Sequence, residues 1–270
     1  MAGTLATWTG RVGDAWHALR APADGPRVAV SSVPKAGTHL LISALRRVPG
    51  VRVIPELVLG KVGVEGTLRR LERVAPYQVL VGHIVYEPRV AAALDARGIR
   101  LVLMIRDPRD VVVSLAKYIP RAHVGHRFHD YFTRVLTSDH DRIMACIRGV
   151  GGEHAEDGRA QPDIGTLFRS YLAWTEHHAV HTCRFEDLVG PHGGGSERAQ
   201  LEALQRLAAW LGYGLRDDEV AAIARATFSK DSLTFRKGEI GDFRNHFAPE
   251  HEAAFREVAG DLLGRLGYAA

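Results

Sequence analysis

Residues 27–45 read RVAVSSVPKAGTHLLISAL, a short apolar run followed by a tight turn and a second apolar segment. The run over 27–32 is typical of a buried strand, and 38–48 has the composition of a helix. A turn that joins a strand to a helix start can bind an anion, because the first helix amides lack intrahelical partners and the helix dipole favours negative charge. Gly37 allows close approach to the backbone, and Lys35 and Thr38 add a positive charge and a hydroxyl. An ordinary turn between strand and helix is the alternative.

The rest of the chain alternates strand-like and helix-like segments. Strands are expected at 51–54, 77–83, 99–105 and 180–185. Helices are expected at 87–98, 108–118, 166–179, 197–212, 217–226 and 250–264. This alternation predicts an α/β fold with a central parallel sheet flanked by helices.

The length of 270 residues favours one domain over 1–270. We expect 1–26 to be a variable lead-in. The stretch 119–165 is rich in His, Arg and Gly, and we expect it to form a partly mobile cover over the site.

The composition limits the classes of function. A formal net charge of +4 suits an anionic ligand and does not require nucleic acid. The only two cysteines, Cys146 and Cys183, fit a reducing compartment. No apolar run approaches the roughly 18 residues of a membrane span, and the N-terminus does not resemble a signal peptide. We therefore expect a cytoplasmic protein without a membrane span.

Two further basic segments resemble anion sites. In RDPRDVVVS, Arg106 ends a core strand and Ser114 follows eight residues later, about two turns into a helix, so both can reach one anion. Alternatively, Arg106 pairs with Asp107 or Asp110. The third segment is RKG, residues 236–238, which a surface loop would also explain. Together the three segments fit a ligand with two separated phosphate-like groups.

The turn at 34–38 differs from the ATP-binding loop of kinases. That loop reads G-x-x-x-x-G-K-[ST], with the lysine after the second glycine. Here Lys35 precedes Gly37 and the loop is shorter, which disfavours an ATP-type kinase.

Four segments resemble, in order, those of sulfotransferases that use 3′-phosphoadenosine 5′-phosphosulfate (PAPS). They are PKAGTHL (34–40), RDPRDVVVS (106–114), RFEDL (184–188) and FRKGEIGDFRNHF (235–247). The resemblance implies a P-loop-like α/β fold and transfer of a sulfuryl group to a hydroxyl or amine. We expect the acceptor to be a small-molecule, phenolic or glycolipid compound, and the cover at 119–165 to shape its pocket.

The resemblance also assigns the groups of PAPS to residues of this chain. The 5′-phosphosulfate is assigned to Lys35, Ala36, Gly37, Thr38 and His39. The 3′-phosphate is assigned to Arg106, Ser114, Arg236, Lys237 and Gly238. Phe228 stands where the family stacks an aromatic ring on adenine, and Phe185 replaces a tyrosine beside the base.

Four residues are candidates for the chemistry. His83 resembles the family's catalytic base, although a buried core histidine is the alternative. The resemblance makes Lys35 the residue that stabilises the leaving phosphate, and implies that Ser114 holds Lys35 back until the acceptor arrives. Glu56 is the rival base, because glycan-type members use a glutamate after the second strand.

We expect no metal. The histidine groups 123, 126, 129 and 177, 178, 181 lack a cysteine or carboxylate that would complete a ligand set in the sequence.

Several positions depart from the family pattern. Leu40 replaces a stacking tryptophan, and Val81 stands where cytosolic members have a lysine. The family's dimer motif does not follow GDFRN, so a homodimer would form by another route. A nucleotide or small-molecule kinase and a catalytically inactive PAP-binding protein are the alternative functions, where PAP is the desulfated product of PAPS.

Overall fold

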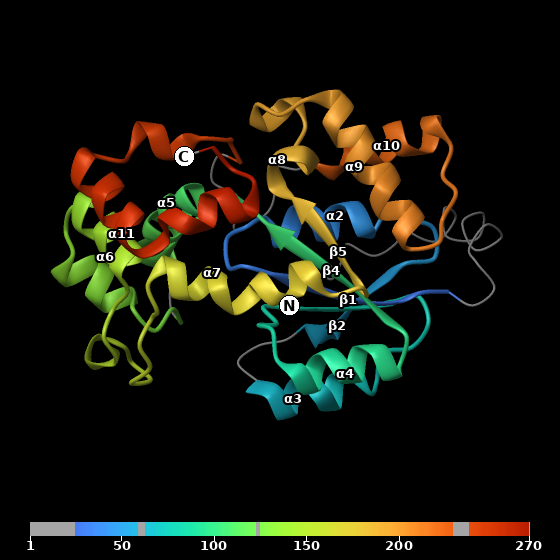
Figure 1. Ribbon diagram of the computed structural model, residues 1–270, viewed down its shortest axis with the longest axis horizontal. Helices are drawn as coiled ribbons and strands as arrows, with labels where there is room; N and C mark the ends of the chain where they lie inside the picture. The colour runs from blue at the N-terminus through green and yellow to red at the C-terminus, as the bar shows by residue number, and fades with distance from the viewer. Residues whose placement is uncertain (1–24, 59–62, 123–124, 229–237, 270) are drawn as a thin grey trace, which may run out of the picture.

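The computed structural model describes residues 25–58, 63–122, 125–228 and 238–269, with the backbone alone at 55–58 (Figure 1). The expected lead-in at 1–26 therefore lies almost wholly outside the described residues. A five-stranded sheet forms the centre, and its strand order is β2-β3-β1-β4-β5. The strands are β1 (Arg27–Ser32), β2 (Arg52–Val58), β3 (Gln78–Gly82), β4 (Ile99–Ile105) and β5 (Val180–Arg184).

All four strand pairings are parallel, and β1 lies in the middle of the sheet. Val28 pairs with Val79 of β3 on one side and with Arg100 of β4 on the other. Val28, Ala29 and Val30 have no exposed surface, as expected for a central strand covered on both faces. The chain leaves β1 toward β2 on one side and later returns to β4 on the other. Ligands bind at the carboxyl ends of the strands at such a reversal of order.

Helices cover both faces of the sheet and gather at one end. They are α2 (Thr38–Leu45), α3 (Gly63–Leu71), α4 (Pro88–Ala96), α5 (Pro108–Tyr118), α6 (Asp139–Arg148), α7 (Ile164–Leu172), α8 (Phe185–Leu188), α9 (Glu197–Trp210), α10 (Asp217–Thr227) and α11 (Pro249–Leu266). In Figure 1, α3 and α4 lie below the sheet and α2, α9 and α10 above it. α5, α6, α7 and α11 pack together at the left of the same view. The predicted α/β architecture is confirmed.

The segment 119–165 contains more regular structure than the sequence analysis anticipated. α6 begins after Ser138, whose Oγ accepts a hydrogen bond from the Asp141 amide at 3.0 Å. Its buried face, Ile143, Cys146 and Ile147, packs against α5 and α11. The three- and four-residue apolar spacing was readable in the sequence but was obscured by the surrounding glycines and histidines. The mobility of this segment stays a prediction.

The remaining differences are local. β2 extends to Val58, beyond the predicted 51–54, and α3 was not anticipated. The predicted helix at 166–179 starts at Ile164 and ends at Leu172, and a 3-10 turn follows at Ala173–Glu176. That turn buries Trp174, whose indole N–H donates to the carbonyl of Ile84 at 2.9 Å.

Among the helices of the described ranges, none combines the length and the apolar composition that crossing a bilayer requires.

Candidate active site

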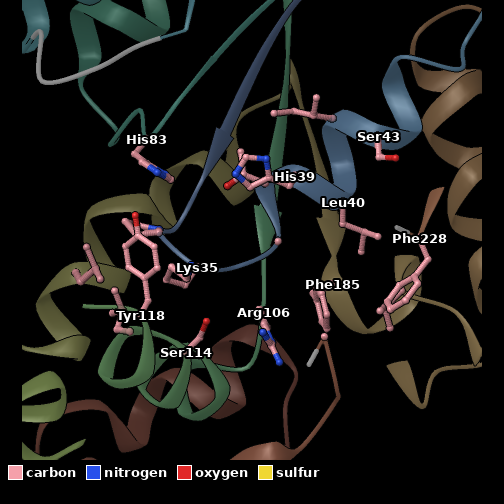
Figure 2. A pocket seen from close by; sticks show the side chains of 18 of the residues that line it. Lys35, His39, Leu40, Ser43, His83, Arg106, Ser114, Tyr118, Phe185 and Phe228 are labelled. Carbon is pink, nitrogen blue, oxygen red and sulfur yellow. The ribbon is translucent and has the colours of Figure 1, made fainter. Parts of the chain in front are cut away.

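A cleft of about 910 Å³ opens beside the turn that follows β1 (Figure 2). Its volume lies within the range of small-molecule sites. One lysine and four arginines line it: Lys35, Arg46, Arg47, Arg106 and Arg127. Of the lining residues that the structure describes, none is an aspartate or a glutamate. The cleft is therefore suited to a ligand with several negative charges.

The turn after β1 is held in an unusual backbone conformation. The Ala36 amide donates to the Val33 carbonyl at 3.0 Å, which closes the turn. Lys35 has a φ of 68° and Gly37 a φ of 108°, both in the left-handed region. α2 starts directly afterwards, and no described side chain caps its N-terminus. The first amides of α2 are thus placed beside the cleft, as the sequence predicted for Thr38 and His39, whereas the Ala36 amide is engaged inside the turn.

Two features of this turn require a glycine at position 37: the left-handed backbone and the close approach of neighbouring side chains. An added Cβ would lie 2.7 Å from Cδ2 of Phe185 and 2.9 Å from Cε of Met104.

Gly37→Ala is therefore expected to lower the free energy of unfolding by about 1–3 kcal/mol from the strained φ alone. Denaturant titration measures this change. Gly214→Ala is the control, because a Cβ there meets nothing within 4 Å. Equal midpoints for the two variants would contradict the account.

The second basic segment places Arg106 at the end of β4, where its side chain is almost fully buried. The guanidinium donates to Asp110 Oδ2 at 3.3 Å and to the carbonyl of Glu239 at 2.6 Å. It also lies 4.2 Å from the ring centroid of Phe185. The pairing with Asp110 was one of the two alternatives, yet Arg106 and Ser114 still line the same cleft.

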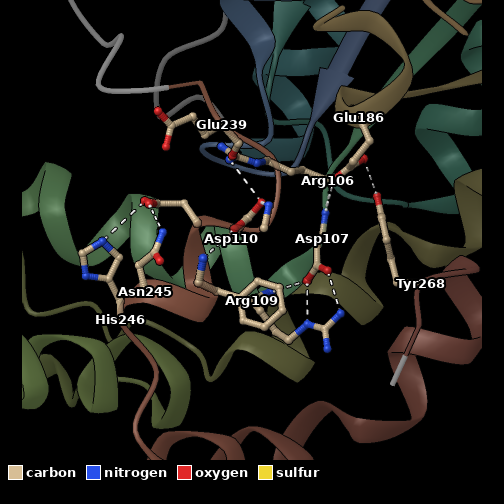
Figure 3. A network of polar contacts seen from close by, with 12 residues as sticks. Arg106, Asp107, Arg109, Asp110, Glu186, Glu239, Asn245, His246 and Tyr268 are labelled. Carbon is tan, nitrogen blue, oxygen red and sulfur yellow. Dashed lines mark hydrogen bonds and ion pairs between the residues drawn. The ribbon is translucent and has the colours of Figure 1, made fainter. Parts of the chain in front are cut away.

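Asp110 ties the third basic segment to this site (Figure 3). Its Oδ2 accepts from the Gly241 amide at 2.8 Å, and its Oδ1 accepts from the Phe243 amide at 3.0 Å. Gly238, which precedes these residues, lines the cleft. Arg236 and Lys237 lie outside the described residues. The sequence analysis treated Asp110 only as a possible partner of Arg106 and missed its role as an anchor of the C-terminal segment.

The FEDL segment supports the start of α5 from the other side. Glu186 Oε1 accepts from the Asp107 amide at 2.9 Å, and its Oε2 accepts from the Tyr268 hydroxyl at 3.0 Å (Figure 3). Burial raises the pKa of Glu186, although these hydrogen bonds oppose the shift. Asp107 caps α5 through the Arg109 amide at 2.9 Å. The glutamate of this motif therefore holds the helix that carries Ser114.

His83 follows β3 and faces the cleft (Figure 2). Its Nδ1 lies 2.7 Å from the Ser32 carbonyl oxygen. A carbonyl can only accept, so Nδ1 carries the proton and Nε2 keeps a free lone pair. The pKa of His83 lies below its usual value, mainly because the surrounding protein desolvates the ring. The Ser32 hydrogen bond opposes this shift, and the nearby charge of Lys35 adds to it.

Ser32 connects His83 to the turn, and the sequence analysis did not single it out. Its Oγ lies 2.5 Å from the hydroxyl of Thr38 and 3.2 Å from Nδ1 of His83. Ser32 is fully buried at the end of β1. A polar residue that ends a buried strand was the signal for it.

Lys35 lies with its Nζ 3.8 Å from the ring centroid of Tyr118, the last residue of α5 (Figure 2). Ser114 is one helical turn earlier and lines the same cleft. Tyr118 is therefore a further neighbour of Lys35 that the sequence motifs did not indicate.

The opposite end of the cleft is aromatic. Phe185 packs against Gly37 and Arg106, and Phe228 stacks on His192 with ring centroids 5.1 Å apart. Leu40 lies between them in Figure 2. The side chain of Glu56 lies outside the described residues, so the rival base stays a prediction.

The histidines that are grouped in the sequence have different neighbours in the structure. His177 and His178 each place Nε2 3.4 Å from a carboxylate oxygen of Asp95, which the sequence spacing did not reveal. The Ala179 amide donates to Nδ1 of His177 at 3.2 Å, so the proton of the neutral ring is on Nε2, the nitrogen that faces Asp95. His181 instead stacks on Trp210. Of the first cluster, His123 lies outside the described residues and His126 lines the cleft.

Comparison with known proteins identifies relatives along most of the chain. No family model matches it. Sulfotransferase 6B1 of Danio rerio is 21% identical, over 88% of this chain and 78% of the relative. Sulfotransferase 6B1 of Homo sapiens is also 21% identical, with the same coverage.

Solved structures share the fold. Mouse sulfotransferase SULT7A1 complexed with PAP matches with a TM-score of 0.65 and 20% identity, over 95% of this chain and 93% of that chain. Retinol dehydratase in complex with androsterone and PAP matches with a TM-score of 0.56 and 15% identity, over 87% and 80% of the two chains. The P-loop-like fold predicted from the four motifs is confirmed.

Proposed function

We propose that this chain, a member of the PAPS-dependent sulfotransferase family, transfers the sulfuryl group of PAPS to a hydroxyl or amine of a small molecule in the cleft described above. The family predicted from the four motifs is confirmed by the curated relatives, which match 88% of the chain. The observation that supports the proposal for the cleft itself is its geometry. Lys35, Arg106 and His83 come from three different strand ends and line one cavity.

The cleft residues fit the charges of PAPS. We assign the 5′-phosphosulfate to the left-handed turn and the start of α2, where Lys35, Gly37, Thr38 and His39 lie. We assign the 3′-phosphate to Arg106, Ser114 and Gly238, with Arg236 and Lys237 following from the sequence motif. Arg106 fits this role because its Nε is buried without a hydrogen-bond partner in the described structure. The adenine would lie toward Phe185 and Phe228.

The chemistry follows from the positions of His83 and Lys35. Nε2 of His83 takes the proton of the acceptor hydroxyl as its oxygen attacks sulfur. The bond from sulfur to the bridging oxygen breaks in line, and that oxygen leaves with PAP as negative charge. Lys35 stabilises this charge, for which a positioned cation in a dry site is effective. We propose that the ammonium group of Lys35 moves from the Tyr118 ring to the bridging oxygen during the reaction.

The alternative functions are less well supported. A kinase would need a Walker lysine and a following Ser or Thr, and the turn at 34–38 has neither in the required order. An inactive PAP-binding protein would not need a histidine whose Nδ1 proton is fixed by the Ser32 carbonyl and whose Nε2 can accept a proton. A single domain over 1–270, a cytoplasmic location and the oligomeric state stay predictions.

The test is stabilisation by PAP compared with ATP and ADP. A ligand at 100 times its dissociation constant adds about 2.7 kcal/mol to the free energy of unfolding. We expect a clear rise in melting temperature with PAP, and a much smaller one in Arg106→Ala. Arg148→Ala is the control, because Arg148 forms an exposed pair with Glu257 outside the cleft. Stabilisation by ATP without stabilisation by PAP would favour a kinase instead.

A further inference from the structure

We infer that the acceptor carries a carboxylate or a similarly compact anionic group, which Arg127 binds at the end of the cleft beyond Tyr118. This inference rests on the proposed function and adds a substrate class to it. It starts from the fact that the cleft holds more positive charge than the assigned PAPS sites use.

The position of Arg127 follows from a short series of contacts. Lys35 Nζ lies 3.8 Å from the Tyr118 ring centroid, and the Tyr118 and His126 centroids are 6.1 Å apart. Arg127 is the next residue and lines the same cleft. Figure 2 shows Tyr118 and Phe228 on opposite sides of the cleft, with Lys35 between them. Arg127 therefore belongs to the Tyr118 side of the cleft, where the reacting groups lie, and not to the proposed adenine side.

The charge of Arg127 is not balanced by the described protein. Its guanidinium donates to the Ala160 carbonyl at 3.2 Å and lies 5.1 Å from the ring centroid of Phe128. Its Nε is shielded from solvent and has no hydrogen-bond partner in the described structure. A half-buried cation without a carboxylate partner gains more from a bound anion than an exposed one does.

Arg46 and Arg47 also line the cleft without an assigned group of PAPS, but they differ from Arg127 in their exposure. Arg47 donates to the carbonyl and hydroxyl oxygens of Ser43, at 2.7 and 2.9 Å, and is exposed. Arg46 is also exposed, on the same helix end. These two arginines face water, so they offer an anion less than the half-buried Arg127.

The apolar residues that line the cleft indicate the character of the rest of the acceptor. Leu115, Pro162 and Leu167 line the cleft together with Tyr118. A cleft that combines these apolar side chains with a base and a cation suits a compact apolar or aromatic body with a hydroxyl at one end and an anionic group at the other. Such acceptors would be hydroxylated carboxylic acids.

The experiment compares two probes that differ in charge and little in shape. They are 4-hydroxyphenylacetate and 4-hydroxyphenylacetamide, each assayed with PAPS in the wild type, in Arg127→Gln and in Arg127→Lys. We expect kcat/KM in the wild type to be at least about tenfold higher for the acid, the factor that corresponds to about 1.4 kcal/mol. Arg127→Gln should remove this preference, mainly through a higher KM for the acid, and Arg127→Lys should keep part of it.

Arg134→Gln is the matched control, because Arg134 belongs to the same segment and pairs with Asp130 at the surface. It should keep the preference for the acid. Equal kcat/KM for the two probes, or a preference that survives Arg127→Gln, would overturn the inference.

A binding measurement covers the case in which neither phenol is sulfated. With PAP saturating, 4-hydroxyphenylacetate should raise the melting temperature of the wild type more than the amide does, and should lose that advantage in Arg127→Gln. If it shows no advantage while PAP still binds, the anionic subsite is wrong. If PAP itself does not bind, the proposed function is wrong, and the two failures are thereby distinguished.

Discussion

Lys35→Ala is expected to lower kcat for sulfuryl transfer by about 10²–10³-fold, the cost of losing one preorganised group that stabilises developing charge. The lysine is the only Lys that lines the described part of the cleft. Its left-handed backbone, with a φ of 68°, fixes where the side chain starts. Because the ammonium lies against Tyr118 before the reaction, its main contribution is expected in the transition state, so kcat should fall more than KM rises.

Steady-state kinetics with PAPS and one acceptor measure this effect, alongside the melting temperature with and without PAP. Lys117→Ala is the control, since Lys117 lies on α5 but pairs with Asp139 outside the cleft. A Lys35→Ala enzyme that folds, binds PAP and turns over at nearly the wild-type rate would remove Lys35 from the mechanism.

The sequence predicted the structure well where neighbouring residues along the chain determine the local conformation. The apolar run at 27–32 is typical of a buried strand, and it is the central strand of the sheet. The turn at 34–38 combines a glycine, a cation and a helix start, and the structure places it beside the cleft. Arg106 at a strand end pairs with Asp110, one of the partners that the alternative interpretation named, because an unpaired buried charge is costly.

What escaped prediction depends on contacts between distant segments. Asp110 binds amides of Gly241 and Phe243, more than 130 residues later, and no local pattern marks such a pairing. Ser32 meets His83 only because β1 and β3 are neighbours in the sheet. α6 was hidden because its apolar face is short and flanked by polar, glycine-rich sequence, so that packing against α5 and α11 decides its conformation.

His83→Ala is expected to lower kcat by about 10²–10⁴-fold, the usual contribution of a positioned general base. The Ser32 carbonyl fixes the proton on Nδ1, so that Nε2 is the nitrogen that can accept one from the acceptor. Because desolvation and the charge of Lys35 lower the pKa of His83, the ring stays neutral and active at pH 7. In the wild type, kcat/KM should therefore rise with pH through a value below the usual 6.5 for histidine and then level off.

The pH dependence separates His83 from its rival Glu56. If His83 is the base, His83→Ala loses the rising limb below pH 6.5, whereas Glu56→Gln keeps it. If Glu56 is the base, His83→Ala keeps a limb nearer the glutamate value of about 4.3, and Glu56→Gln abolishes it. His178→Ala is the control for removing a histidine, because His178 is exposed beside Asp95 and does not line the cleft. The shape of the profile thus decides which residue takes the proton, independently of how far the rate falls, since a merely structural loss would lower the whole curve without moving its limb.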